Sequence, residues 1–351
     1  MQPPAEADPT VVSISTPADI LGVLPHRLGF TPRESLVVVC LDGPRRRDRL
    51  VMRADLGDPA HDRSLAAELA DRAVRAGATA AILVCYTEGG ADSGRLARAA
   101  LVTELTERLG EQDTEVVEAL LVREGRWWSY RCSDQACCPR DGTPLSERLT
   151  PAAGRYAAES VARGDVVLGD RQDLVGSIEP PDDAVARQVR DQAADSAAER
   201  LGEVAGERGP DGVRALTMAT LRRLADHWVE GRCEVDPGAA ALVALGLHDI
   251  PARDEAMTLL LDREPGALVG LFSRLARLTD DVDAAPLCTV LAWTAYADGN
   301  GALAAVAAER ALRAQPGYSM ALLVLDGLDQ MVPPAAIRDV SAQVRADLRD
   351  E

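Results

Sequence analysis

The stretch LVVVCL, residues 36–41, is a continuous apolar run rich in valine that stops at Asp42-Gly43. A short β-branched run bounded by a turn signal is typical of a strand that is buried on both faces. Strands of this kind occur in sheets that helices cover on both sides. The run therefore predicts an α/β domain.

Helices and strands alternate on either side of this run. Thr16, Pro17 and Asp19 predict a helix start, with a hydroxyl cap, an early proline and an acid near the positive end of the helix dipole. We expect that helix to end near Pro25. Further strands are expected at 50–56, 79–86 and 116–122, and further helices at 61–77 and 96–109. Because strand–helix–strand order implies crossovers, we expect an α/β sandwich with a mainly parallel sheet over residues 13–178.

After residue 181 the pattern is purely helical. Apolar residues recur every four positions from Val185 to Leu201, and a second helix follows a cap at Asp211. Seven further helices are expected at 238–247, 252–261, 265–278, 286–298, 301–314, 319–331 and 334–349. Helices of this length with short connections favour a bundle or a short solenoid, so residues 181–349 predict an all-α, repeat-like domain. Residues 1–12 are expected to form a disordered N-terminus.

One helical pair has a sharper pattern. Residues 291–321 (LAWTAYADGNGALAAVAAERALRAQPGYSMA) resemble a single tetratricopeptide repeat, and the predicted hairpin covers 288–318. Gly299, Ala304, Ala311 and Pro316 stand where that repeat has its turn glycine, two small packing residues and terminal proline. Trp293 and Tyr296 lie three residues apart on one face of the first helix. They are either anchors for a protein partner or core residues.

Residues 125–145 (GRWWSYRCSDQACCPRDGTPL) differ most from the rest of the chain. They hold two of the four tryptophans and three of the seven cysteines. Together with SISTPADILGVLPHRLGFTPRESLVVVCLDG (13–43), this segment resembles the actinobacterial domain of unknown function 4192. The resemblance extends over roughly residues 13–330. It implies no activity that could be transferred to this chain.

The cysteines of this segment permit several interpretations. Cys132, Cys137 and Cys138 have the spacing C-x4-C-C, whereas structural zinc usually takes four ligands in C-x2-C pairs. We therefore expect neither a bound metal nor a cofactor. A redox role would need an exposed thiolate of low pKa, which Arg131 and Arg140 could favour.

The remaining interpretations of the segment are structural or concern a partner. The simplest is a hairpin packed on the sheet edge. A partner-binding surface is the other alternative. The residues concerned are Trp127, Trp128, Tyr130, Cys132, Cys137 and Cys138.

A second candidate site is the loop 87–94, which follows a predicted buried strand and precedes a predicted helix. Ligands of parallel sheets bind at such loops, so Gly89, Gly90 and Gly94 form a candidate ligand loop. The loop matches neither a dinucleotide-binding nor a Walker motif, and its acidic residues would repel phosphate. The interpretation as a plain connection is favoured.

Composition restricts the class of protein. The 351 residues carry 38 basic and 56 acidic side chains, a formal charge of −18, which disfavours nucleic acids and anionic membranes as partners. No apolar run approaches the length that spans a bilayer, and the first ten residues lack the features of a signal peptide. Four of the seven cysteines, Cys40, Cys85, Cys233 and Cys288, lie in apolar stretches. Buried free thiols are typical of a reducing compartment, so a cytoplasmic location is expected.

Three functional interpretations stay open, and no catalytic residue is assigned. The first is a non-enzymatic protein-interaction or regulatory module with an unknown protein partner. The second is an enzyme or small-molecule sensor at the C-terminal edge of the sheet. The third is a thiol redox sensor centred on Cys132–Cys138. The absence of a catalytic motif favours a protein that is not an enzyme.

Overall fold

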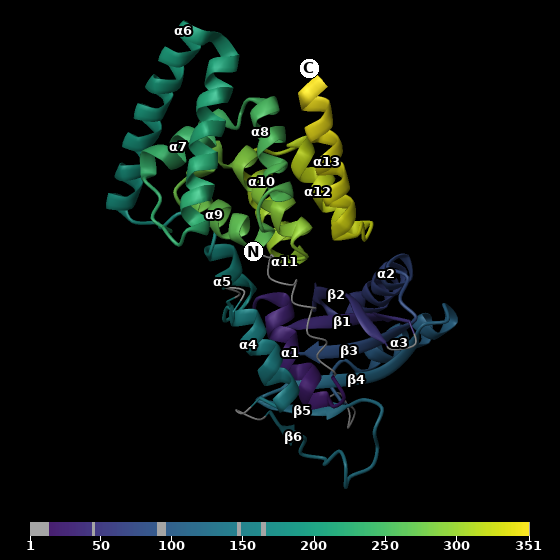
Figure 1. Ribbon diagram of the computed structural model, residues 1–351. Coiled ribbons are helices and arrows are strands. Elements are labelled where there is room, and N and C mark those ends of the chain that lie inside the picture. The colour runs from purple at the N-terminus through teal and green to yellow at the C-terminus, as the bar shows by residue number, and fades with distance from the viewer. Residues whose placement is uncertain (1–13, 44–45, 90–95, 146–148, 163–165, 351) are drawn as a thin grey trace, which may run out of the picture. The chain divides into compact units, whose positions relative to one another are not determined.

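The computed structural model describes residues 14–43, 46–89, 96–145, 149–162 and 166–350 (Figure 1). Residues 1–12, expected to be disordered, and two glycines of the candidate ligand loop, Gly90 and Gly94, lie outside these ranges. The chain divides into two compact units, Met1–Asp170 and Arg171–Glu351.

The first unit contains five helical elements and six strands among its described residues. In chain order they are α1 (Pro17–Leu28), β1 (Ser35–Asp42), β2 (Arg47–Asp55), η1 (Pro59–His61), α2 (Asp62–Arg75), β3 (Ala80–Tyr86), α3 (Ala99–Glu111), β4 (Glu115–Arg123), β5 (Arg126–Ser129), β6 (Thr143–Pro144) and α4 (Pro151–Ala162).

The strands form one mixed sheet in the order β2-β1-β3-β4-β5-β6. Only β3 and β4 pair in parallel, and the other four pairings are antiparallel, so the prediction of a mainly parallel sheet is wrong. Short turns make β1–β2 and β4–β5 antiparallel hairpins. Helix α2 connects β2 to β3. These two strands run in the same direction but do not pair, because they lie on opposite sides of β1 and each pairs antiparallel with it.

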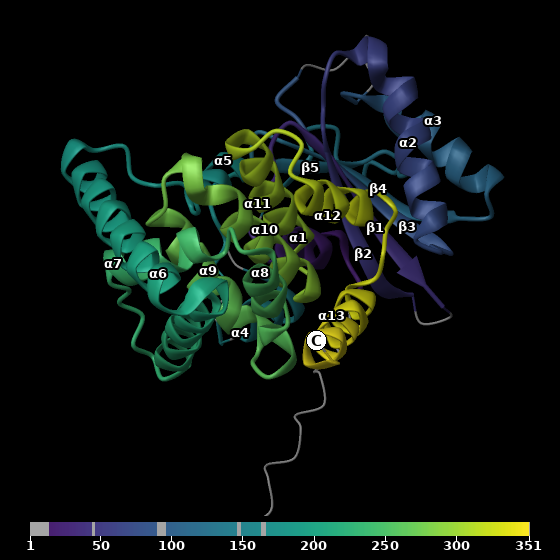
Figure 2. The same ribbon diagram turned by 90° about the horizontal axis from the view of Figure 1, so that it is seen from above.

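Helices cover both faces of this sheet. Helices α2 and α3 pack together on one face, and α1 and α4 pack together on the other (Figure 1, Figure 2). Both alternating sets of β1 side chains are buried, since Leu36, Val37, Val38 and Cys40 are fully buried and no side chain from Leu36 to Leu41 exceeds 7% exposure. The predicted α/β sandwich with LVVVCL inside it is therefore confirmed.

Helix α1 begins as the sequence predicts but ends later. The Thr16 side chain accepts a hydrogen bond from the Asp19 amide at 3.2 Å, and the Asp19 carboxylate accepts one from the Thr16 amide at 2.9 Å. The helix continues through Pro25 to Leu28 and ends at Gly29, whose φ of 78° is left-handed. Proline removes one helical hydrogen bond without stopping this helix, and the glycine ends it.

The second unit is helical throughout its described residues. Its elements are α5 (Arg171–Gly176), α6 (Ala184–Val229), α7 (Pro237–Gly246), α8 (Ile250–Met257), η2 (Leu259–Leu261), α9 (Pro265–Arg277), η3 (Asp281–Asp283), α10 (Ala284–Ala297), α11 (Gly301–Ala314), α12 (Ser319–Asp329) and α13 (Pro334–Asp350). Across the described part of the chain, no helix combines the length and apolar character needed to cross a membrane.

Two details of this unit extend the sequence interpretation. Helix α6 changes direction at Gly209, which has non-helical backbone angles and separates the two helices expected there (Figure 1). Residues 171–178 belong to this unit, whereas the sequence placed them with the α/β domain. The reason is Arg310 on α11, which is fully buried and donates to the Ile178 carbonyl, so that the segment is fixed on the helices.

Candidate functional site

The Trp/Cys segment forms a hairpin at the edge of the sheet, with a long connection between β5 and β6. We call residues 130–142 the cluster loop. Trp128 of β5 lies against this loop: its indole N–H donates to the Arg140 carbonyl at 3.0 Å, and the Arg123 guanidinium carbon is 5.4 Å from the ring centroid. A Cβ on Gly142 would come within 2.4 Å of that ring, and Gly142 has a φ of 74°. The Trp128 indole can therefore occupy this place only because residue 142 has no side chain.

The start of the cluster loop is fixed to the sheet. The Ser129 hydroxyl donates to the Glu118 carboxylate at 2.9 Å and accepts from the amides of Arg131 and Cys132 at 3.1 and 3.2 Å. The Tyr130 hydroxyl donates to the Ala97 carbonyl at 2.6 Å. Burial, with a smaller contribution from the Cys85 thiol, raises the pKa of Tyr130, so this phenol is a structural donor and not an acid.

A tight turn over residues 134–138 then directs the second half of the cluster loop back towards Cys132. The Asp134 carbonyl accepts from the amides of Cys137 and Cys138 at 3.2 and 2.6 Å, and its carboxylate accepts from the Ala136 amide at 2.9 Å. The side chains of Cys137 and Cys138 are thereby brought to Cys132. We call these three residues the thiol cluster.

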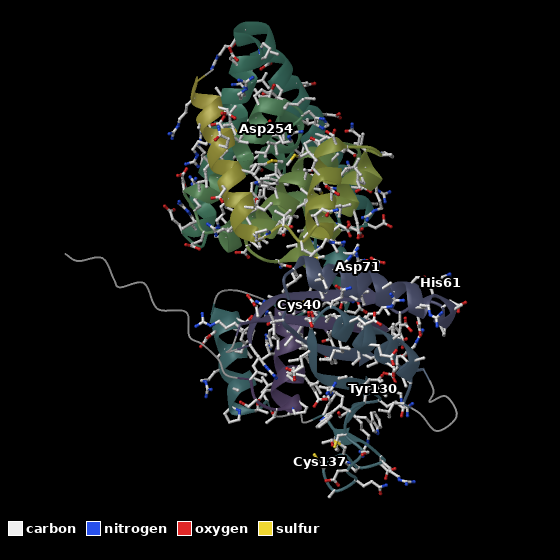
Figure 3. The ribbon with its side chains drawn as sticks, turned by 90° about the vertical axis from the view of Figure 1, so that its right-hand side faces the viewer. Cys40, His61, Asp71, Tyr130, Cys137 and Asp254 are labelled. Atoms are coloured by element: carbon white, nitrogen blue, oxygen red, sulfur yellow. The ribbon has the colours of Figure 1, made fainter. Side chains whose placement is uncertain are left out.

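All three Sγ atoms of the thiol cluster lie within 4.8 Å of one another, and those of Cys137 and Cys138 are 4.0 Å apart. Cys137 is exposed and the other two are half-buried. Figure 3 shows Cys137 on the loop beyond the sheet, with Tyr130 nearer the sheet. Desolvation, followed by hydrogen bonds with the other two thiols, raises the pKa of Cys138 to about 12.

Three of the four other cysteines are core residues. Cys40, Cys85 and Cys288 are fully buried, and burial raises the pKa of Cys40 to about 12 and of each of the others to about 11. Cys233 is exposed in the connection between α6 and α7, so the expectation that it is buried is wrong. Its immediate neighbours in the sequence, Arg232 and Glu234, are charged, and both lie in the same connection.

The candidate ligand loop is occupied by the protein's own groups in its described part. The Glu34 carboxylate accepts from the Thr87 hydroxyl at 2.9 Å and from the Glu88 amide at 2.6 Å. The Gly89 amide donates to the Thr87 hydroxyl at 3.0 Å. Glu34 is thus at the position that a bound anion would take, and no pattern around it in the sequence indicated this.

Trp293 and Tyr296 are not open anchors. They are 7% and 4% exposed, so the alternative interpretation as core residues holds. The Trp293 indole N–H donates to the Ser341 hydroxyl at 2.9 Å. The Tyr296 hydroxyl lies 2.7 Å from the carbonyls of both Gly327 and Val332. The helices after residue 319 cover this face of α10, which the repeat pattern by itself could not show.

A small cavity lies within the helical unit, with a volume of about 210 Å³. Arg190 lines it and is 6% exposed, but its guanidinium pairs with Asp280 at 2.7 Å and donates to the Pro181 carbonyl at 3.2 Å. The buried charge of Arg190 is therefore balanced inside the protein and is not left free for a ligand.

Comparison with known proteins places the chain in a protein family. The chain matches the family described as Domain of unknown function (DUF4192) over residues 17–335. It belongs to the DUF4192 family. The match extends over β1, the cluster loop and most of the helical unit, and the family description names no activity. No curated protein and no solved structure matches the chain.

Proposed function

We propose that this DUF4192 protein is a non-enzymatic regulatory module whose sensing element is the thiol cluster. The proposal rests on one observation: three thiols from an exposed loop lie within 4.8 Å of one another. The chemical state of these thiols sets the conformation of the cluster loop. That conformation in turn controls the binding of a partner protein.

The cluster loop is suited to this role because it has almost no core of its own. From Arg131 to Asp141 every side chain is exposed or half-buried. Its shape depends on a few hydrogen bonds from Ser129, Asp134 and Trp128. Segments with few buried contacts open at low free-energy cost, so a bond between the thiols changes the loop more than it changes the sheet.

The chemistry available to the cluster is either a disulfide or a bound ion. Two thiols form a disulfide with loss of two protons and two electrons, which hydrogen peroxide takes up to give two waters. The second candidate function, an enzyme or small-molecule sensor at the sheet edge, has weaker support. The amides of Glu88 and Gly89 already donate within the protein, and Glu34 opposes an anionic ligand.

Hydrogen exchange of the full chain tests the proposal. Amide exchange would be compared between the reduced protein, the peroxide-treated protein and protein with Zn²⁺ added. We expect exchange in peptides covering residues 130–145 to slow in at least one treated state, while peptides from β1 and β3 stay unchanged.

Matched variants make the result specific. Replacing Cys132, Cys137 and Cys138 together by serine should abolish the response, whereas Cys233→Ser should preserve it, because Cys233 is an exposed thiol outside the cluster. Unchanged exchange at 130–145 in every state of the wild-type chain would contradict the proposed function.

A further inference from the structure

We propose that the thiol cluster is a binding site for one thiophilic metal ion, of the Zn²⁺ or Cu⁺ class, held by three thiolates. This inference rests on the proposed function and names the ligand of the same site. Two sulfur atoms about 2.3 Å from one ion, at a trigonal angle of about 120°, are about 4.0 Å apart. The Sγ atoms of Cys137 and Cys138 are 4.0 Å apart, and Cys132 completes the set within 4.8 Å.

The donor set selects the kind of ion. Among the described residues, no histidine, aspartate or glutamate joins the three sulfurs. Thiolates are soft ligands that favour Cu⁺ and Zn²⁺, whereas Mg²⁺ and Ca²⁺ require oxygen. Three thiolates satisfy a trigonal Cu⁺ completely, and they leave Zn²⁺ one open position for water. The sequence argument against metal rested on the spacing and on a closed zinc site of four ligands. A site of three thiolates does not need the fourth ligand, and the fold brings the three sulfurs within 4.8 Å despite the spacing.

The number of thiols favours an ion over a disulfide. A disulfide uses two thiols and leaves one without a role, whereas an ion uses all three. A disulfide also requires the sulfurs to approach about 2.0 Å, and Cys137 and Cys138 are adjacent in sequence and 4.0 Å apart.

The loop around the cluster is built as a ligand scaffold. Ser129 fixes the amide of Cys132, and the Asp134 carbonyl fixes the amides of Cys137 and Cys138. Trp128 and Gly142 hold the far end of the loop. A segment with no core, but with every ligand residue oriented by backbone hydrogen bonds, is the arrangement that a metal cross-link stabilises.

Metal titration of the reduced, metal-free full chain tests the inference. Cd²⁺ is added first, because its thiolate charge-transfer absorption counts the sulfur ligands. Zn²⁺ and Cu⁺ are then measured in competition with chromogenic chelators, and this identifies which of the two ions the site prefers. We expect one ion per chain, three sulfur ligands and no competition from excess Mg²⁺.

Three single variants, Cys132→Ser, Cys137→Ser and Cys138→Ser, should each weaken binding at least about tenfold. The control Cys233→Ser should bind like the wild type. Equal melting temperatures of the metal-free variants show that the loss is local. Failure to bind any of the ions, or binding that survives the triple serine variant, overturns the inference.

The two proposals can fail separately. If no ion binds but peroxide still changes hydrogen exchange at residues 130–145, the metal inference is wrong and the proposed function stands. If an ion binds to the cluster but neither the ion nor peroxide changes that exchange, the proposed function is wrong and the metal inference stands. If no ion binds and exchange is unchanged in every state, both are wrong.

Discussion

Trp128 and Gly142 form the closest pairing of residues in the candidate site. A methyl group on Gly142 would overlap the indole, and its φ of 74° is unfavourable for any residue with a Cβ. We expect Gly142→Ala to cost about 1–2 kcal/mol for the backbone and about 1–3 kcal/mol more for the overlap. Denaturant unfolding of the full chain measures the loss.

Gly125 provides the control for this prediction. It also has a positive φ, of 70°, but an added Cβ there meets nothing within 4 Å. Gly125→Ala should therefore show only the backbone cost, about 1–2 kcal/mol. Equal losses in the two variants would mean that the Trp128 ring moves aside freely and does not hold the loop.

Thiol accessibility provides a second prediction at this scale. A chromogenic disulfide reagent should reach Cys132, Cys137, Cys138 and Cys233 in the native reduced protein, and the three buried cysteines only after unfolding. The reagent has to contact the sulfur atom, and Cys40, Cys85 and Cys288 are fully buried, so these three stay unreacted in the native protein. Reaction of all seven thiols without denaturant would contradict the buried positions.

The sequence identified these cysteines as chemically interesting but did not show that they meet. The spacing C-x4-C-C limits how far apart the three Cα atoms can lie, but it does not fix the directions of the side chains. Hydrogen bonds to the Asp134 carbonyl bring Cys137 and Cys138 back towards Cys132. The one local feature of the sequence that indicates this turn is Asp134, because aspartate is a common turn residue and stands three positions before the paired cysteines.

At the scale of elements, helices were predicted better than strand pairing. The predicted helices at 265–278 and 301–314 agree closely with α9 (Pro265–Arg277) and α11 (Gly301–Ala314). Their starts are set by local signals, such as Pro265 in the first turn and the Asn300 side chain that accepts from the Leu303 amide. The place of β3 beside β1 is a contact between distant segments, and alternation of strands and helices does not encode it.

Arg310 of α11 shows how one side chain joins several elements. Its buried guanidinium donates to the carbonyls of Ile178, Ala276 and Thr279, and it pairs with Asp281 at 3.1 Å. Arg310→Met keeps much of the volume but removes every donor. We expect a loss of about 3–5 kcal/mol in the free energy of unfolding, since each buried carbonyl left without a donor costs about 1–3 kcal/mol.

Arg313 on the same helix is the matched control. Its ion pair with Glu179, at 2.7 Å, is about half exposed on both sides. Exposed pairs contribute less than about 1 kcal/mol, so Arg313→Met should change stability little. Comparable losses in the two variants, measured by urea unfolding, would show that Arg310 does not hold the 171–180 segment in place.

At the scale of the whole molecule, charge is the dominant feature. All 38 basic residues are arginine, and the chain contains no lysine. The excess of acid is concentrated in residues 171–351, which hold 30 acidic and 18 basic side chains, a formal charge of −12 out of −18. Arginine stays protonated and ordinary carboxylates stay ionised between about pH 7 and 8, and the chain has only four histidines, so the net charge changes little in that range.

Salt therefore affects this repulsion far more than a moderate change of pH does. Added NaCl screens the excess negative charge, whereas the half-buried ion pairs, such as Arg98 with Asp62 at 2.6 Å, are screened less. We expect the melting temperature at pH 7.5 to rise between about 0.02 and 0.5 M NaCl, over which the Debye length falls severalfold. KCl should act in the same way, which separates screening from effects of one particular ion. A melting temperature that falls as salt is added would show that the attraction within surface ion pairs outweighs the repulsion of the 18 excess charges.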